Sequence, residues 1–226
     1  GLVGSEMCIR DRVCMGKGIT NILKDLGVDR VIEGGQTMNP STDDILKAVK
    51  RVKAKTVYVF PNNKNIIMAA NQAAELVEDK KIVVIPSKSV PQCISAMVEF
   101  NDKKSAEANE KAMNKAIGRV TSGQLTYAVR DTEIDGIEIK KDDILGMVEG
   151  KIVTVGKDID DVLNRVVSQM VDEDTEFLNV YYGKEIKKPQ ADVMLKALET
   201  KYADDEIEVS FKKGGQPLYY YIISAE

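Results

Sequence analysis

Three short apolar runs, each followed by a polar loop and a helical pattern, dominate the first hundred residues. The runs cover residues 30–33, 56–60 and 81–85, and the second is rich in β-branched and aromatic side chains, as in a strand buried on both faces. Apolar residues at helical spacing follow each run. Regular alternation of this kind predicts βαβ units and a parallel sheet. We therefore expect an α/β fold for this half of the chain, with helices flanking a largely parallel sheet.

Polar side chains follow each of the three predicted strands. Because the carboxyl ends of parallel strands lie at one edge of a sheet, these side chains should converge where open α/β sheets bind ligands. The alternative for each loop is a well-capped connection without a ligand; Ser41 can cap a helix, with Asp44 three residues later as an imperfect capping box. The candidate residues at the strand ends are Asn39, Ser41, Thr42, Asp43, Asn62, Asn63 and Lys64.

The second half has a different pattern, reached through a polar helix predicted at about 105–118. Strand-like runs occur at 124–130, 151–155, 177–182, 206–211 and 218–224, and helical spacing at 158–171 and 191–200. An Asp-Gly pair predicts a hairpin at 134–137, and we expect further turns at 140–143, 146 and 149–150. These patterns predict an α+β fold with a mixed sheet. The expected subdomains are 13–119 and 120–226.

Two further patterns concern how the chain is organised. Gly-Gly-Gln occurs at 34–36 and again at 214–216, which indicates either shared turn chemistry or related subdomains. Residues 1–12 show no helical or strand period and resemble a translated sequencing-adaptor or assembly scar, so we leave them out of the fold prediction. On this interpretation the natural protein continues upstream, and residues 13–15 are the remnant of its first strand.

Several classes of chemistry lack the residues they need. The chain has no histidine, which excludes Ser-His-Asp and Cys-His nucleophile systems and histidine-bound metals. Its three cysteines have no C-x-x-C spacing, and no P-loop pattern is present. Adjacent aspartates on a helix do not face one another, so the Asp-Asp pairs are weak metal candidates. We predict no catalytic residue and no metal site, and a reducing cytoplasm as the location.

Charge is unevenly distributed between the halves. Residues 1–120 carry a formal charge of +5 and residues 121–226 carry −9. An acidic half argues against nucleic acid as a partner, and no apolar run approaches the ~20 residues that a membrane span needs. The acidic half fits a basic protein partner, and plain solubility is the alternative explanation.

Long motifs add a family resemblance over residues 13–226. The sequence is similar to the carboxy-terminal domain of the bacterial fatty acid kinase catalytic subunit, often described as a DAK2-domain or dihydroxyacetone-kinase-like protein. The motifs that carry the resemblance are V-I-E-G-G-Q-T-M-N-P-S-T-D-D-I-L (31–46), F-P-N-N-K-N-I (60–66), V-I-P-S-K-S-V-P-Q (84–92), G-Q-L-T-Y-A-V-R-D-T (123–132), I-K-K-D-D-I-L-G (139–146) and G-G-Q-P-L-Y (214–219).

The resemblance implies two DegV-like subdomains and a division of labour. ATP and magnesium would bind an amino-terminal domain of the full-length kinase, and this fragment, with no cofactor of its own, would dock a fatty-acid-loaded DegV-family protein and contact the other domains of its own chain. Alternatives are a small-molecule or lipid-binding domain, or part of a dihydroxyacetone-type kinase. The expected partner contacts are carboxylates of the second half: Asp131, Glu133, Asp135, Asp142, Asp143, Asp172, Glu173 and Asp174.

Overall fold

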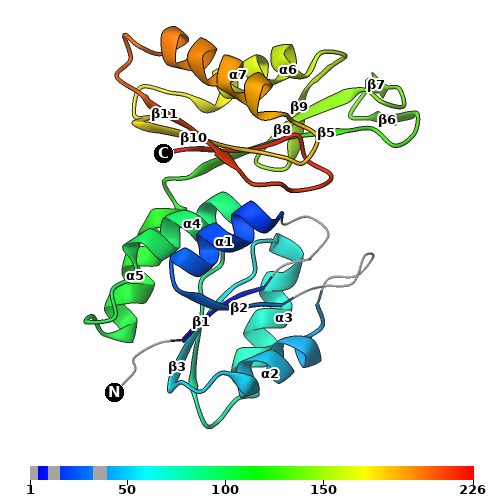
Figure 1. Cartoon of the computed structure of the whole chain (residues 1–226). Coiled ribbons are helices and arrows are strands. Elements are labelled where there is room, and N and C mark those ends of the chain that lie inside the picture. Colours follow the sequence, from blue (N-terminus) through cyan, green and yellow to red (C-terminus); the bar gives the residue numbers. More distant parts are fainter. Residues whose placement is uncertain (1–4, 10–15, 33–39) are drawn as a thin grey trace. The chain divides into compact units, whose positions relative to one another are not determined.

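The computed structural model describes residues 5–9, 16–32 and 40–226, which form seven helices and twelve strands (Figure 1). They divide into two compact units. The first comprises strand β1 (Ser5–Ile9) and Thr20–Val120, and the second comprises Gly16–Ile19 and Thr121–Glu226. The predicted α/β architecture, with a parallel sheet in the first unit and a mixed sheet in the second, is confirmed.

The first unit is built on a four-stranded parallel sheet in the order β2-β1-β3-β4. Strands after β1 are β2 (Val28–Ile32), β3 (Thr56–Phe60) and β4 (Lys81–Val84). The helices of this part of the chain are α1 (Lys17–Asp25), α2 (Thr42–Arg51), α3 (Lys64–Glu75), α4 (Val90–Glu99) and α5 (Ala106–Ile117).

β1 was not predicted, because the sequence analysis expected no strand in residues 1–12. It pairs in parallel with β2 on one side and β3 on the other. A strand in the middle of a parallel sheet is held by two backbone ladders and need not alternate polar and apolar residues, so a search for period two misses it. That residues 1–12 are an assembly scar stays a prediction. Residues 13–15 and Asn39, and the first Gly-Gly-Gln, lie outside the described residues.

β3 shows why the parallel sheet is stable, because helices cover both of its faces. Val57 and Val59 belong to the core cluster that α2 and α3 form with the sheet. Between them, Tyr58 points to the other face, where its ring meets Phe100, the residue that ends α4, edge to face at 5.6 Å. The four consecutive residues from Val57 to Phe60 are therefore all buried, as the unbroken apolar run predicted.

The second unit contains a six-stranded mixed sheet in the order β11-β10-β12-β5-β8-β9, with α6 and α7 on the same face (Figure 1). All neighbouring pairs are antiparallel except β10 and β11. Its elements are β5 (Thr121–Tyr127), β6 (Thr132–Ile134), β7 (Ile137–Ile139), β8 (Ile144–Val148), β9 (Lys151–Gly156), α6 (Ile159–Met170), β10 (Phe177–Tyr182), α7 (Lys188–Lys201), β11 (Glu208–Lys213) and β12 (Tyr221–Ala225).

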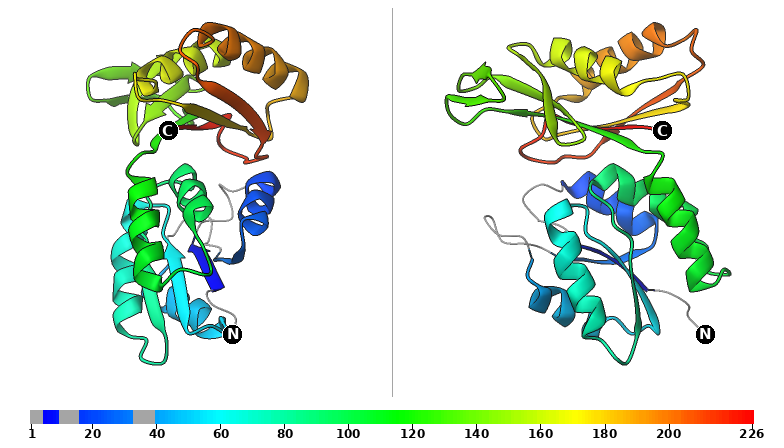
Figure 2. Two further views of the ribbon diagram at one scale, coloured as in Figure 1. Left: turned by 90° about the vertical axis from the view of Figure 1, so that its left-hand side faces the viewer. Right: turned by 180° about the vertical axis from the view of Figure 1, so that it is seen from behind.

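Two of the predicted turns of this unit, at 134–137 and 149–150, are confirmed as tight hairpin turns. Asp135 and Gly136 join β6 to β7, and both have positive φ, as a two-residue hairpin turn of type I′ requires. Glu149 and Gly150 join β8 to β9 in the same way. The β6–β7 ribbon is a separate two-stranded sheet that extends beyond the end of the large sheet (Figures 1 and 2).

Gly146 was expected at a turn, and this was wrong: it lies inside β8, a strand that the sequence analysis did not predict. The residue is buried where α6 crosses the sheet, and a Cβ atom there would lie 2.4 Å from Val166 Cγ2 and 2.5 Å from Thr154 Cγ2. Glycine is needed because the helix packs directly on the backbone.

Within the described ranges, none of the helices combines the length and the apolar character that crossing a bilayer requires.

The close approach at Gly146 yields a stability prediction. Gly146→Ala should destabilise the second unit by about 1–3 kcal/mol, because both contacting atoms belong to β-branched side chains with little freedom to move. Urea unfolding followed by tyrosine fluorescence measures this directly, since seven of the eight tyrosines lie in the second unit and the chain has no tryptophan.

Gly118→Ala is the control for a glycine with room for an added Cβ. Because Gly118 lies in the first unit, unfolding of both variants is also followed by far-ultraviolet circular dichroism, which reports on both units. Gly118 ends α5 at φ −73°, and the atom nearest to an added Cβ is 3.5 Å away, so this change should be neutral or slightly stabilising. Equal destabilisation by the two substitutions would contradict the packing explanation.

Candidate functional site

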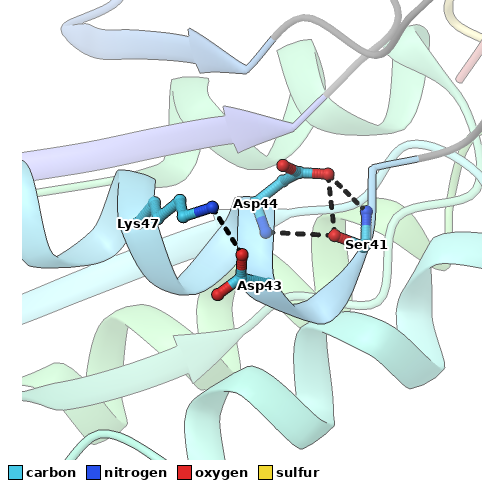
Figure 3. Close-up of polar contacts among 4 residues, drawn as sticks. All are labelled: Ser41, Asp43, Asp44 and Lys47. Atoms are coloured by element: carbon cyan, nitrogen blue, oxygen red, sulfur yellow. Dashed lines mark hydrogen bonds and ion pairs between the residues drawn. The ribbon is translucent and has the colours of Figure 1, made fainter.

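The polar residues at the start of α2 hold the helix end together. Ser41 and Asp44 form a complete capping box: the Asp44 amide donates to Ser41 Oγ at 3.2 Å, and the Ser41 amide donates to Asp44 Oδ2 at 3.0 Å (Figure 3). The Ser41 hydrogen bonds hold the pKa of Asp44 below its ordinary value. Asp43 pairs with Lys47 at 2.5 Å, and Thr42 Oγ1 donates to Gln72 Oε1 at 3.1 Å. Each of these side chains thus has a structural role.

The loops that follow β3 and β4 meet at one edge of the parallel sheet. The Asn62 amide donates to Ser87 Oγ at 3.1 Å, and the Ser87 hydroxyl donates to Asn62 Oδ1 at 2.6 Å, with both residues buried. Asn63 caps α3 by accepting from the Asn65 amide, and Lys64 is exposed in the first turn. Asn62 and Ser87 therefore join the loops after β3 and β4 to each other. The shared contact of all three loops stays a prediction.

The predicted acidic contacts of the second unit do not form one cluster. The strand register places the ends of β5 and β10 beside the starts of β8 and β12, at what we call the pocket end of the sheet. Residues 131–143 connect β5 to β8 at this end. Residues 172–174 precede β10 and lie at the opposite end, beside the last residues of β12. The eight carboxylates are therefore split, five at the pocket end and three at the opposite end.

Some of these carboxylates are used within the fold. Asp143 is buried; its Oδ2 accepts from the Lys140 amide at 2.8 Å, and its Oδ1 pairs with Lys157 Nζ. These two contacts hold the pKa of Asp143 below its ordinary value. Asp131 Oδ1 accepts from the Lys141 amide at 2.7 Å. At the opposite end, Asp172 Oδ1 accepts from the Thr175 hydroxyl at 2.9 Å and the Asp174 amide at 3.1 Å.

The β6–β7 ribbon presents charge on one face and apolar side chains on the other. Glu133 and Glu138 are directly opposite each other and exposed, an arrangement of like charges that weakens a two-stranded ribbon. Ile134 and Ile137 are opposite each other on the other face and are 42% and 37% exposed. Asp135, in the turn, is exposed as well. The ribbon therefore adds acidic and apolar contact surface at the pocket end.

A cavity of about 340 Å³, which we call the aromatic pocket, also lies at the pocket end. It is lined by Tyr127 at the end of β5, Asp142 before β8, residues 184–185 after β10 and residues 217–220 before β12. The rings of Tyr127 and Tyr220 lie 5.9 Å apart, centroid to centroid, at an angle of 55°. Burial, followed by the nearby Tyr127, Glu185 and Asp142, raises the pKa of Tyr220 and keeps its phenol neutral.

Backbone hydrogen bonds fix the rim of the aromatic pocket. The second Gly-Gly-Gln begins the loop, and the Gly214 and Gly215 amides both donate to the Tyr182 carbonyl at 3.0 Å. Further along, Thr126 Oγ1 donates to the Leu218 carbonyl at 2.7 Å, and the Tyr220 amide donates to the Leu125 carbonyl at 2.9 Å. The loop is thus attached to both neighbouring strands.

Sequence reasoning singled out Asp142 but missed the other pocket residues. Tyr127 and Tyr219 lie within motifs that carried the family resemblance, while residues 184–185 lie in none of them. Tyrosines at strand ends look the same in sequence whether they pack in a core or line a cavity. The signal available was that two of these motifs contain a tyrosine within a predicted strand, at 124–130 and 218–224.

Comparison with known proteins identifies relatives and similar folds. Residues 12–226 match the FakA-like family model, which describes the C-terminal part of a fatty acid kinase subunit. The chain is 50% identical to the protein YloV of Bacillus subtilis (strain 168) over 214 residues, which is 95% of this chain and 38% of that protein. The chain therefore spans well under half the length of this relative.

Solved structures of low sequence identity share the fold. A DegV-family protein from Thermus thermophilus, studied for fatty acid binding, superimposes with a TM-score of 0.62 at 11% identity, covering 99% of both chains. The dihydroxyacetone kinase of C. freundii, in complex with AMP-PNP and Mg²⁺, gives a TM-score of 0.65 at 9% identity, covering 99% of this chain and 48% of the kinase. At these identities the similarity establishes the DegV-like fold alone.

The ion pair at the base of the ribbon yields a pH prediction. Because the pKa of Asp143 is lowered in the folded protein, its stabilising contribution is complete above the unfolded value of about 3.9 and is lost as the pH falls through the folded value. Lys157→Met should raise the pKa of Asp143 and move acid unfolding of the second unit to higher pH. Carboxyl carbon NMR titration and tyrosine fluorescence measure the two effects.

Lys196→Met, which removes an exposed lysine from α7, is the control for the loss of one positive charge. It should leave the Asp143 titration unchanged. If both variants shift that titration equally, general charge rather than the local pair sets the pKa.

Proposed function

Because the chain belongs to the FakA-like, C-terminal family of fatty acid kinases, we propose that it is a docking domain that recruits a fatty-acid-loaded DegV-family protein to that kinase. In this proposal the kinase as a whole transfers phosphate to the fatty acid carboxylate, making an acyl phosphate. ATP and magnesium would bind in the part of the relatives' length that this chain does not span. The complex would form in the cytoplasm.

The observation that carries the proposal is the exposed acidic surface at the pocket end of the second unit. Asp142 and Glu185 are exposed and line the aromatic pocket. Glu133, Asp135 and Glu138 are exposed on the β6–β7 ribbon at the same end of the sheet, where Glu138 pairs with Lys140 at 2.5 Å. Interfaces that combine aromatic side chains with complementary charge gain association rate and specificity. A partner with a basic face is the class of protein that such a surface favours.

The first unit supports a structural role rather than a catalytic one. The polar residues at its strand ends hydrogen-bond to one another or cap helices, as Asn62 with Ser87 and Ser41 with Asp44 do. In the described part of the chain, no group of three or more acidic or cysteine side chains could hold a metal ion. A docking role is compatible with these structural roles, because docking needs no catalytic group at the strand ends.

Lipid binding is the second candidate function, favoured by one observation. A DegV-family protein that shares this fold over 99% of both chains is described by its fatty acid binding. Native mass spectrometry of the purified chain tests it. A co-purified fatty acid would support a lipid-binding domain, and a protein without one would favour docking alone.

Charge reversal at the two ends of the second sheet tests the docking proposal. Sedimentation velocity of the chain with a fatty-acid-loaded DegV-family protein from the same source should show a complex that weakens as salt rises, because the Debye length shortens from about 30 Å at 0.01 M to 8 Å at 0.15 M. Glu133→Lys with Asp142→Lys, at the pocket end, should weaken this complex about tenfold or more at low salt.

The matched control reverses two charges at the opposite end, with Glu173→Lys and Asp174→Lys. Both residues are exposed, and this variant should bind nearly as well as the unmodified chain. Absence of any complex at low salt would reject the docking role. Equal weakening by the two variants would mean that net charge, not the pocket end, attracts the partner.

A further inference from the structure

The size and walls of the aromatic pocket restrict what can occupy it. Its volume of about 340 Å³ is near the lower end of the roughly 300–1,000 Å³ typical of ligand sites, which suits one side chain or a similarly small group. Tyr127 and Tyr220 both line it, with their ring centroids 5.9 Å apart, and the face of a tyrosine ring carries the negative side of the aromatic quadrupole. Aromatic walls of this kind favour a flat or positively charged occupant.

The charged groups around the pocket favour a cation. Asp142 and Glu185 contribute two carboxylates and Lys184 one ammonium group, which leaves a net charge of one negative. All three residues line the pocket and are exposed, so their side chains can reorganise around an incoming group. A phosphate or fatty acid carboxylate would be repelled by the two carboxylates, so the pocket does not suit the anionic ligands of a kinase reaction.

The rim of the pocket is already in place before anything binds. The Leu218 carbonyl is held by Thr126 Oγ1, and the Tyr220 amide and carbonyl are held by the Leu125 carbonyl and the Gly183 amide. A preformed site avoids the entropy cost of ordering a loop on binding. The backbone that carries Leu218 and Tyr220 is therefore held in place at the end of the sheet.

We infer that the aromatic pocket is an anchor site for one arginine side chain of the docking partner. The inference rests on the proposed docking function and names the chemistry of its central contact. A planar guanidinium stacks on aromatic faces and forms paired hydrogen bonds with a carboxylate, whereas lysine offers only a point charge. Arginine in a desolvated pocket lined by aromatic residues is a common energetic centre of protein interfaces.

The pocket is tested without the partner by titrating the chain with Nα-acetyl-arginine N-methylamide and following backbone amides by NMR. The amides of Leu218, Tyr219 and Tyr220 should shift and saturate. The citrulline analogue, which has the same shape but no charge, should cause no saturable shift there. Equal shifts with the two probes, or shifts confined to residues 172–174, would overturn the inference.

Paired variants separate the pocket from the general charge of the unit. Asp142→Asn with Glu185→Gln should abolish the response to the arginine probe, and Glu173→Gln with Asp174→Asn, at the opposite end, should leave it intact. Both variants remove two carboxylates, and circular dichroism establishes whether each is folded. Tyr127→Leu, which keeps an apolar wall but removes the aromatic face, should also weaken the response.

The partner complex then distinguishes failure of the anchor from failure of docking. The pocket variant should weaken the complex with the DegV-family protein about tenfold more than the opposite-end variant does. If the two variants weaken it equally, the pocket is no anchor although docking stands. If the unmodified chain forms no complex, the docking proposal fails, whereas the arginine titration still decides whether the pocket binds a guanidinium.

Discussion

The last strand of the chain, β12, holds the second unit together. It pairs along its whole length with β10 on one side and β5 on the other, and all five of its residues are buried. It thereby joins segments that are about fifty residues apart in sequence, and its alternate side chains Tyr221, Ile223 and Ala225 enter the core beneath α6 and α7. Tyr221 is fully buried, and the low polarity around it raises the pKa of its phenol. Because β12 lies between β10 and β5, the six-stranded sheet is complete only when the last strand of the chain has paired.

The same strand positions the candidate site. The loop that enters β12 forms one wall of the aromatic pocket, and the ends of β5 and β10 supply the groups opposite it. Because antiparallel pairing returns the chain to the same end of the sheet, Tyr127, Asp142 and Glu185 converge at the pocket end from distant parts of the sequence. The proposed docking surface is therefore a consequence of sheet topology, and its geometry should persist wherever the β12 register does.

Sequence patterns predicted the elements whose interactions are mainly local. The limits of β3 and β10 agree with the apolar runs at 56–60 and 177–182, and both Asp-Gly and Glu-Gly turns were located from residues that adopt positive φ. β8 was missed because Gly146 has the sequence appearance of a turn, and only the packing of α6 explains it. The eight acidic candidates were grouped by half of the chain, yet strand order separates them to two ends of the sheet. The position of β8 and the separation of the acidic candidates both depend on contacts between residues far apart in sequence, which composition does not encode.

Hydrogen–deuterium exchange of the chain, alone and mixed with a fatty-acid-loaded DegV-family protein from the same source, tests the central claim most directly. Docking at the pocket end predicts slower exchange in residues 126–143 and 214–220 when the partner is present, and unchanged exchange in residues 172–174. Slower exchange at residues 172–174 or in the first unit, with the pocket end unchanged, would contradict it.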